Sequence, residues 1–199
     1  MALSERGRAY SDKGDLERAI ADFDRLIKLN PNSAAAYQDR GRAYAAKGKA
    51  DLAIADFDQS IRINPNDDVV IFDRASAYQG KALYDRAIAD FDQVVRINPK
   101  NAPAYYNRGL AYKSKGNLEH AIADFDQAVN INPNYDVAFY NRGVIYKQQR
   151  DYPRAITSFT AAVRINPQMD VAYFDRGLIY QDQGDYPREI GRASCRERV

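Results

Sequence analysis

The sequence has little of what metal binding, redox chemistry and disulfide crosslinking require. Its 199 residues contain one cysteine, Cys195, and one histidine, His120. A single cysteine can form neither an internal disulfide nor a cysteine-based metal cluster. No serine or cysteine has a histidine partner in a recurring context, and no phosphate-binding glycine loop is present. We therefore expect no metal, no cofactor and no enzymatic activity, and we interpret His120 as a solvated surface residue.

An excess of one charge and long hydrophobic runs are also lacking. The 29 lysines and arginines are interleaved with 27 aspartates and glutamates, for a formal charge of +2. Because a nucleic-acid-binding protein usually carries a basic stripe, we expect no nucleic-acid partner. No segment approaches the roughly 18 apolar residues of a transmembrane helix, and the first residues do not resemble a signal peptide. These absences predict no membrane partner and favour a cytoplasmic location.

What the sequence does have is a repeat of 34 residues. Glycines recur at this interval, with one alanine in the series, at Gly7, Gly41, Ala75, Gly109, Gly143 and Gly177. Prolines recur in the same way, at Pro31, Pro65, Pro99, Pro133 and Pro167. Within one repeat, the pattern predicts two helices, at 103–115 and 118–131, separated by Gly116 and Asn117. A fixed interval of this kind indicates a solenoid of stacked repeats.

One repeat carries a specific set of side chains, which are Tyr105, Gly109, Tyr112, Ala121, Phe125 and Pro133. This set resembles the tetratricopeptide repeat, and the resemblance spans residues 1–188 without an insertion. The recurring stretches DFDQA and INPN are more similar to bacterial arrays than to eukaryotic cochaperones. The resemblance implies an all-α fold, a tetratricopeptide repeat solenoid of antiparallel helix pairs stacked in a right-handed superhelix.

The repeat also defines the expected domain organisation. We expect repeats at 1–33, 34–67, 68–101, 102–135 and 136–169, followed by a partial sixth at 170–188, and we number positions within a repeat from Ala34 and its equivalents. Residues 189–199, EIGRASCRERV, match an in-frame reading of a common sequencing-adapter oligonucleotide. We interpret them as a non-native tail that replaces the rest of a longer natural chain. Because the sixth repeat loses its second helix, we expect its end to fray.

The recurring small residues and turns have mechanical explanations. A glycine inside a helix costs about 1 kcal/mol relative to alanine, so the glycine at position 8 predicts that another helix passes too close for a Cβ. The turn glycines, such as Gly14 and Gly48, predict a left-handed backbone conformation. Ala82 and Arg150 replace this glycine in two repeats, at a cost on the order of 1 kcal/mol each.

The most unusual polar feature is an arginine where the family has leucine, at Arg6, Arg40, Arg74, Arg108, Arg142 and Arg176. An aspartate recurs with it on the second helices, at Asp22, Asp56, Asp90 and Asp124. Our hypothesis is a ladder of Arg–Asp pairs that links helices within or between repeats. The alternative is a basic ladder for an anionic ligand. Since Ser158 replaces the aspartate in the fifth repeat, Arg142 or Arg176 is expected to lack a partner.

The resemblance implies that positions 2, 5, 6, 9 and 12 of the first helices line a concave groove for a ligand. The groove residues expected on this basis are Phe72, Asp73, Tyr106, Asn107, Leu110, Lys113, Tyr140, Asn141, Val144, Lys147, Phe174 and Asp175. The amides would bond a peptide backbone and the rings would hold its side chains. The aspartates at position 6 would favour basic or amine-bearing segments. The alternative is that the aromatic residues only pack between neighbouring first helices.

These observations favour a protein–protein interaction scaffold that holds a peptide or a partner helix in the groove. Two alternatives remain open. The chain could be the targeting module of a larger, truncated enzyme or regulator, or a structural unit that self-associates weakly through its uncapped C-terminal end. The lysine and asparagine with which chaperone-tail-binding family members hold a terminal carboxylate are missing at the corresponding positions, so that subclass is not expected.

Overall fold

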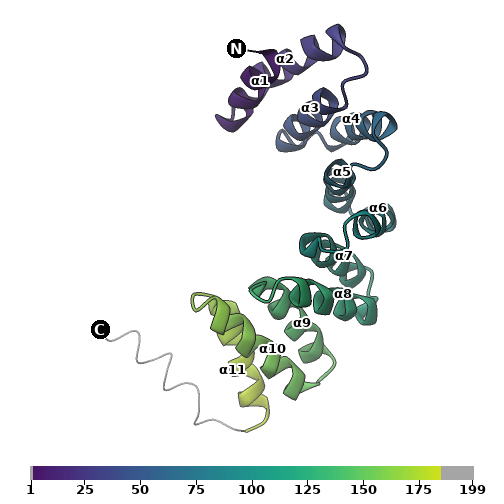
Figure 1. Ribbon diagram of the computed structural model, residues 1–199. Helices are drawn as coiled ribbons and strands as arrows, with labels where there is room; N and C mark the ends of the chain where they lie inside the picture. Colours follow the sequence, from purple (N-terminus) through teal and green to yellow (C-terminus); the bar gives the residue numbers. More distant parts are fainter. Residues whose placement is uncertain (1, 185–199) are drawn as a thin grey trace, which may run out of the picture. The chain divides into compact units, whose positions relative to one another are not determined.

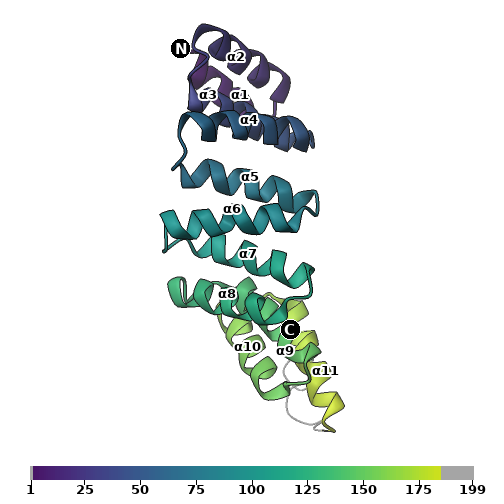
Figure 2. The same cartoon turned by 90° about the vertical axis from the view of Figure 1, so that its right-hand side faces the viewer.

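The computed structural model describes residues 2–184, and all regular secondary structure in this range is α-helical. Eleven helices follow one another with short connections, as Figures 1 and 2 show. Their bounds are α1 (Leu3–Asp12), α2 (Leu16–Leu29), α3 (Ala34–Ala46), α4 (Ala50–Ile63), α5 (Asp68–Gly80), α6 (Tyr84–Ile97), α7 (Ala102–Ser114), α8 (Leu118–Ile131), α9 (Asp136–Gln148), α10 (Tyr152–Ile165) and α11 (Asp170–Asp182). The predicted helices at 103–115 and 118–131 are therefore confirmed, with a shift of one residue in the first.

The helices form two compact bodies. The N-terminal body, Met1–Lys115, contains α1 to α7, and the C-terminal body, Gly116–Val199, contains α8 to α11. Within each body, every helix packs on the one that follows it in the chain, and the first helices of consecutive repeats also touch one another. This nearest-neighbour packing is the all-α solenoid that the repeat predicts.

The turn between the two helices of a repeat is built around a left-handed residue. The glycines Gly14, Gly48, Gly116 and Gly184 have φ between 71° and 78°. Ala82 and Arg150 adopt the same conformation, with φ of 57° and 60°. The conformation expected from the sequence is therefore confirmed at both kinds of position. Side chains cap the N-termini of several of the helices that follow these turns. At the start of α2, for example, the Asp15 side chain accepts a hydrogen bond from the Arg18 backbone amide, and such a cap is worth about 1 kcal/mol.

The core of each repeat is one phenylalanine of the second helix. The rings of Phe23, Phe57, Phe91, Phe125 and Phe159 are almost completely buried. A Cβ added at Gly41 would lie 2.7 Å from Phe57 Cε1, and one at Gly143 would lie 2.7 Å from Phe159 Cε1. The close approach predicted for these glycines is therefore confirmed, but the group that comes close is the aromatic ring rather than a helix backbone. Ala75 occupies the same position in the third repeat and is fully buried beside Phe91.

Two further expectations from the sequence concern the C-terminal end of the chain and membrane-spanning helices. The suspected tail at 189–199 and the second helix of the sixth repeat lie outside the described residues. Within residues 2–184, none of the helices combines the length and the apolar character needed to cross a bilayer.

Candidate functional site

The recurrent arginine joins second helices of consecutive repeats in the N-terminal body. Arg40 binds both carboxylate oxygens of Asp56, at 2.8 Å through Nε and 2.6 Å through Nη2. Its Nη1 also binds Asp24 Oδ1 of the preceding repeat at 2.6 Å. Arg74 repeats this arrangement with Asp90 and Asp58. The predicted ladder is therefore confirmed, and each of these two arginines links helices both within and between repeats.

The electrostatics show that these arginines serve the fold. The hydrogen bond to Asp56 raises the pKa of Arg40 above its ordinary value. Burial alone would lower the pKa of Arg74, but its hydrogen bonds to Asp90 and Asp58 outweigh this effect and raise it. The Arg40 side chain is 19% exposed, whereas Arg6, which pairs with Asp22 and precedes the first complete repeat, is 43% exposed. One buried carboxylate, Asp56, and one partly exposed carboxylate, Asp24, already bind the Arg40 guanidinium, which leaves it little capacity for an anionic ligand.

The C-terminal body uses hydroxyl groups at the equivalent positions of its last repeats. Arg142 donates to Ser158 Oγ at 3.2 Å and to Asp126 Oδ1 at 2.5 Å. Arg176 donates to Thr160 Oγ1 at 2.9 Å. The expectation that Arg142 or Arg176 would lack a partner is therefore wrong. A serine or threonine hydroxyl still accepts a hydrogen bond, and Arg142 has the aspartate of the preceding second helix as well.

The partners at the second position of this ladder were missed in the sequence. They are Asp24, Asp58, Asp92 and Asp126, each paired with the arginine of the next repeat. The signal was present, because an aspartate follows the core phenylalanine in every DFD stretch and changes to Thr160 in the repeat where Ser158 replaces the other aspartate. The outer surface holds a third recurring set of pairs, namely Glu17–Lys47, Asp51–Lys81 and Asp85–Lys115.

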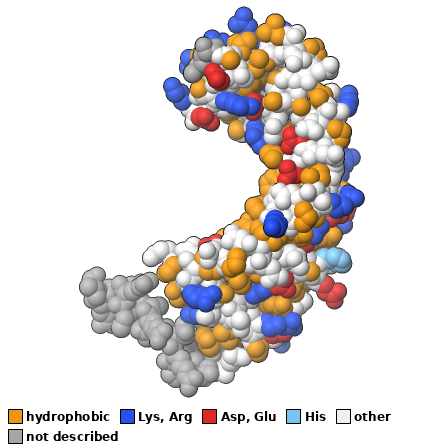
Figure 3. All heavy atoms as spheres, in the orientation of Figure 1, with side chains coloured by type: hydrophobic (Ala, Val, Ile, Leu, Met, Phe, Trp, Pro, Cys, Tyr) orange, Lys and Arg blue, Asp and Glu red, His pale blue; other side chains and the backbone are white. Residues whose placement is uncertain are grey.

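The surface formed by positions 5, 6, 9 and 12 of the first helices, here called the first-helix face, is crossed by ion pairs. In the N-terminal body, Arg8 Nε binds Asp39 Oδ2 at 2.8 Å. Arg42 Nε binds Asp73 Oδ2 at 2.7 Å, and Gln38 approaches the same oxygen at 3.4 Å. The position 6 aspartates expected to attract a basic ligand are therefore already paired with cations of their neighbours. Figure 3 shows acidic, basic and hydrophobic side chains side by side over this body.

A cavity of about 450 Å³ opens on this face between α1 and α3. It is lined by Arg8, Ser11, Asp12, Phe23, Gln38, Asp39 and Arg42. Two arginines and two aspartates give the lining no net formal charge, and Asp12 is exposed. Because the charges cancel, the lining offers both donors and acceptors rather than a field of one sign.

Beyond this cavity, the expected groove residues of the N-terminal body are half-buried. Phe72 packs edge-on against Phe91, with ring centroids 5.4 Å apart. Tyr106, Asn107, Leu110 and Lys113 are of intermediate exposure. The Asn107 amide donates to the Pro103 carbonyl of its own helix at 2.8 Å, which engages one of its donors. Burial lowers the pKa of Lys113 below its ordinary value.

On the first-helix face of the C-terminal body, the polar side chains bond to one another and to their own helix. Tyr140 donates to Asp175 Oδ2 at 2.9 Å, and Lys147 Nζ lies 2.8 Å from Asp175 Oδ1. Burial, together with the bond to Asp175, raises the pKa of Tyr140 to about 12. The Asn141 amide donates to the Val137 carbonyl, and Val144 packs against the core.

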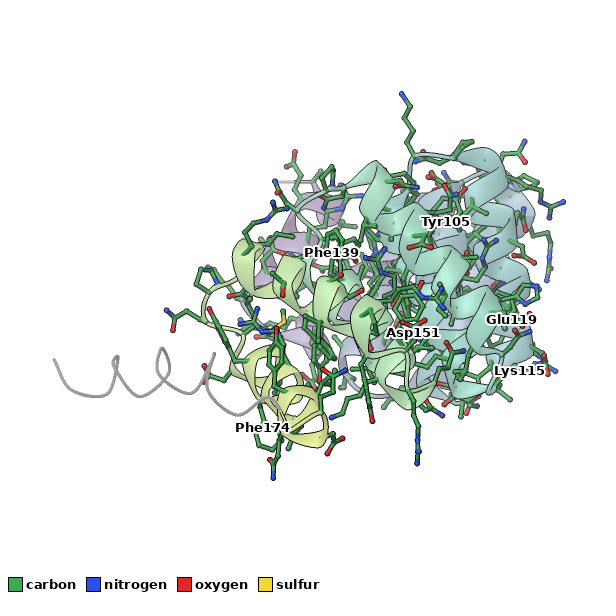
Figure 4. All side chains as sticks on the ribbon, turned by 90° about the horizontal axis from the view of Figure 1, so that it is seen from below. Tyr105, Lys115, Glu119, Phe139, Asp151 and Phe174 are labelled. Carbon is green, nitrogen blue, oxygen red and sulfur yellow. The ribbon has the colours of Figure 1, made fainter. Side chains whose placement is uncertain are left out.

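The aromatic residues were expected either to be open to a ligand or only to pack between helices, and the structure contains examples of both. Phe72 and Tyr140 pack against the core phenylalanines Phe91 and Phe159 while part of each ring stays accessible. Phe174 on α11, labelled in Figure 4, is 68% exposed. The structure therefore gives the face of α5 a half-exposed aromatic platform and leaves Phe174 open.

Other chemistry finds no support in the described part of the chain. His120 is exposed at the start of α8, and its Nδ1 lies 2.8 Å from Asn117 Oδ1, which confirms its surface position. Between residues 2 and 184, no three histidine, cysteine, aspartate or glutamate side chains form a group suited to a metal ion.

Comparisons with known proteins identify the fold and the family. Models described as the tetratricopeptide repeat match residues 4–68 and 137–169, and a TPR repeat model matches 83–116 and 109–150. Among curated proteins, none matches the sequence.

Several solved structures share this architecture. Residues 41-end of MamA from Desulfovibrio magneticus RS-1 give a TM-score of 0.79 at 23% identity, over 84% of this chain and 95% of that one. YrrB, described as a TPR protein with an unusual peptide-binding site, gives 0.74 at 23% identity, over 85% and 88%. Pseudomonas aeruginosa pilF gives 0.81 at 15% identity, over 92% and 84%. At these identities the likeness concerns the fold alone.

Proposed function

The chain belongs to the tetratricopeptide repeat family, and on this premise we propose that it is a protein-interaction module whose first-helix face binds an extended peptide. The observation that carries the proposal is the cavity between α1 and α3, which has a mixed polar lining and the edge of a core phenylalanine within it. The peptide-binding site named for YrrB, which has the same fold, supports this choice.

The polar lining of the cavity suits a peptide better than a simple ion. Arg8 and Arg42 bind their aspartates through Nε, so the Nη donors of both exposed side chains can bind a ligand. Asp12 and Ser11 supply acceptors on the same rim. A peptide backbone presents one donor and one acceptor per residue, which matches this mixed set. A small anion would meet the two aspartates as well as the two arginines.

The neighbouring surface supplies the apolar part of recognition. Phe72, Tyr106 and Leu110 lie on the successive first helices α5 and α7, and each is half-buried. Side chains that are held by packing lose little conformational entropy when a ligand covers them. We therefore place polar anchoring at the cavity and apolar side chains of the peptide on this platform.

The test is a peptide selected from a random library on the full chain and then titrated by calorimetry. We expect the variant Gln38→Ala/Arg42→Ala to weaken the affinity by roughly tenfold or more. The matched control, Gln127→Ala/Arg164→Ala, removes the same two residue types from exposed positions of the second helices α8 and α10 and should bind as the wild type does. Equal binding by the cavity variant, or a loss in the control alone, would contradict the first-helix face as the site.

Self-association is a second candidate because α11 carries an exposed apolar group. Val171 is 55%, Tyr173 37% and Phe174 68% exposed. If this group mediates self-association, sedimentation velocity will show a concentration-dependent shift that the variant Phe174→Ser removes. A wild-type chain that stays monomeric at high concentration would exclude this candidate.

A further inference from the structure

The second helices of the N-terminal body all end in a basic residue followed by an aliphatic one. The three pairs are Lys28-Leu29, Arg62-Ile63 and Arg96-Ile97, and we call them together the basic–aliphatic edge. Leu29 is 75% exposed, and Ile63 and Ile97 are each 38% exposed. All three basic side chains are exposed as well. The edge is separate from the first-helix face, since it belongs to α2, α4 and α6.

The pairs belong to one continuous edge because neighbouring repeats touch there. Gln93 on α6 donates to the carbonyl of Pro65, in the loop that follows Ile63, at 3.2 Å. Val69, at the start of α5, is 48% exposed and extends the apolar surface next to this loop. One repeat earlier, Ser60 near the end of α4 donates to the carbonyl of Ala34, just after the loop that follows Leu29, at 2.9 Å. The three pairs therefore follow one another along the same end of the second helices.

The charge of the edge remains uncompensated by its own carboxylates. Asp67 accepts hydrogen bonds from the Val69 and Val70 amides at the start of α5. Asp68 accepts one from the Asn98 side chain at 3.0 Å. Asp24, Asp58 and Asp92, one helical turn before the three basic residues, are ion-paired with Arg40, Arg74 and Arg108. Among the described residues, Lys28, Arg62 and Arg96 form no ion pair of their own, which leaves the edge basic.

Helix stability explains only part of this pattern. A cation near a helix C-terminus is worth about 0.3–1 kcal/mol through the helix dipole, which accounts for a lysine or arginine at this position. It does not account for an exposed aliphatic neighbour in each of three repeats. In the C-terminal body the same positions hold Asn130-Ile131 and Arg164-Ile165, and both isoleucines are half-buried. Among the described residues, the combination of a basic side chain and an aliphatic one at least 38% exposed thus occurs in the N-terminal body, most strongly at Leu29.

We propose that the basic–aliphatic edge docks an acidic protein segment that carries aliphatic side chains. Carboxylates of the segment would meet Lys28, Arg62 and Arg96, and its aliphatic groups would cover the neighbouring leucine and isoleucines. A protein fits better than a lipid surface because the apolar groups are single side chains separated by basic ones. Insertion into a bilayer interface requires a broader continuous apolar face.

The probe is a fluorescein-labelled synthetic peptide that repeats Glu-Leu-Glu-Ser. Its binding to the full chain is measured by fluorescence anisotropy. Two variants test the two components, Lys28→Gln/Arg62→Gln/Arg96→Gln for charge and Leu29→Ser/Ile63→Ser/Ile97→Ser for apolar contact. The three basic side chains are exposed, so the glutamine variant should melt as the wild type does. Ile63 and Ile97 are each 38% exposed, so binding of the serine variant is measured well below its own melting temperature. The matched control is Arg164→Gln/Ile165→Ser in the C-terminal body.

We expect each triple variant to weaken probe binding by roughly tenfold or more, while the control leaves it unchanged. Binding should also weaken as salt is raised, because the contacts involve exposed charges. Equal binding by the wild type and both triple variants would overturn the proposal. So would equally tight binding of a Lys-Leu-Lys-Ser peptide. Binding to phosphatidylserine vesicles without binding to the peptide would overturn it in favour of a lipid surface. None of these outcomes depends on the cavity between α1 and α3.

Discussion

Ala82 and Arg150 hold a backbone conformation that side chains disfavour. Their φ values of 57° and 60° lie in the left-handed region, where four glycines serve the same turn. A non-glycine residue in this conformation is destabilised by about 1–2 kcal/mol. Replacing it with glycine removes this strain, but the greater conformational freedom of glycine in the unfolded chain offsets part of the stabilisation. We expect Ala82→Gly and Arg150→Gly each to raise the free energy of unfolding by about 0.5–1 kcal/mol.

Chemical denaturation of each single variant measures this gain. The reverse substitution, Gly48→Ala, is the control and should destabilise the chain, because Gly48 has φ of 71°. A loss of stability in Ala82→Gly would show that something other than backbone strain governs the turn.

Tyr140 makes the free energy of unfolding depend on pH in the alkaline range. Its pKa is raised to about 12, first by burial and then by its bond to Asp175, whereas an unfolded tyrosine titrates near 10. The unfolded chain therefore releases the proton first as pH rises. The stability that this group contributes is complete below about pH 10 and is lost as pH rises toward 12.

The measurement compares the wild type with Tyr140→Phe, since the chain has 15 tyrosines and only the difference isolates one of them. Lys147, which also binds Asp175, is present in both proteins and cancels to a first approximation. We expect the wild type to lose more stability than the variant between about pH 10 and pH 12. Parallel curves would contradict the raised pKa.

The arginine ladder determines how one helix pair holds the next. Replacing Asp90 with alanine removes both bonds that Arg74 makes within its repeat and leaves Asp58 as the remaining partner. Losing one partner of a largely buried pair costs about 3 kcal/mol, reduced here to about 2 by the second carboxylate. Thermal melting followed by circular dichroism should show this loss. Peptide affinity at the first-helix face should stay unchanged.

The fifth repeat offers the opposite substitution. Ser158→Asp places a carboxylate where Arg142 now meets a hydroxyl at 3.2 Å. We expect a gain of about 1 kcal/mol, because a hydrogen bond between charged groups is stronger than one to a neutral acceptor. A loss would mean that burying the carboxylate costs more than the new bond returns.

At this scale, the sequence was most informative where the same residue type recurs. Phe57, Ala53 and the turn position Gly48 each have one role in every repeat, so the repeat interval alone located the helices, the core and the turns. The first-helix face was harder to predict. Asp73 could equally face a ligand or a neighbour. Its pairing with Arg42, 31 residues before it in the chain, depends on the distance between α3 and α5. A single sequence contains no information about that distance.

The whole molecule follows the logic of a linear array, in which stability is a sum over neighbouring interfaces. The interface between the fifth and sixth repeats uses Thr160 where earlier ones use an aspartate. We therefore expect native-state hydrogen exchange to be faster in α10 and α11 than in α4 and α6. Mass spectrometry of exchanged peptides measures this directly. Thr160→Asp should slow exchange in α10 and α11, and no change in their exchange rates would contradict the role of the ladder.

The same ladder bears on how the protein can change over evolutionary time. The three complete repeats from residue 34 to residue 135 each supply an arginine for the helix before them and an aspartate for the helix after them, as Arg40 and Asp58 do. A gene duplication or deletion of any one of these three repeats therefore again places each arginine next to an aspartate, whatever the copy number. Removing residues 34–67, for example, would bring Arg74 to Asp24. Lineages can thus lengthen or shorten such an array in single genetic steps without first passing through a form with an orphaned buried charge.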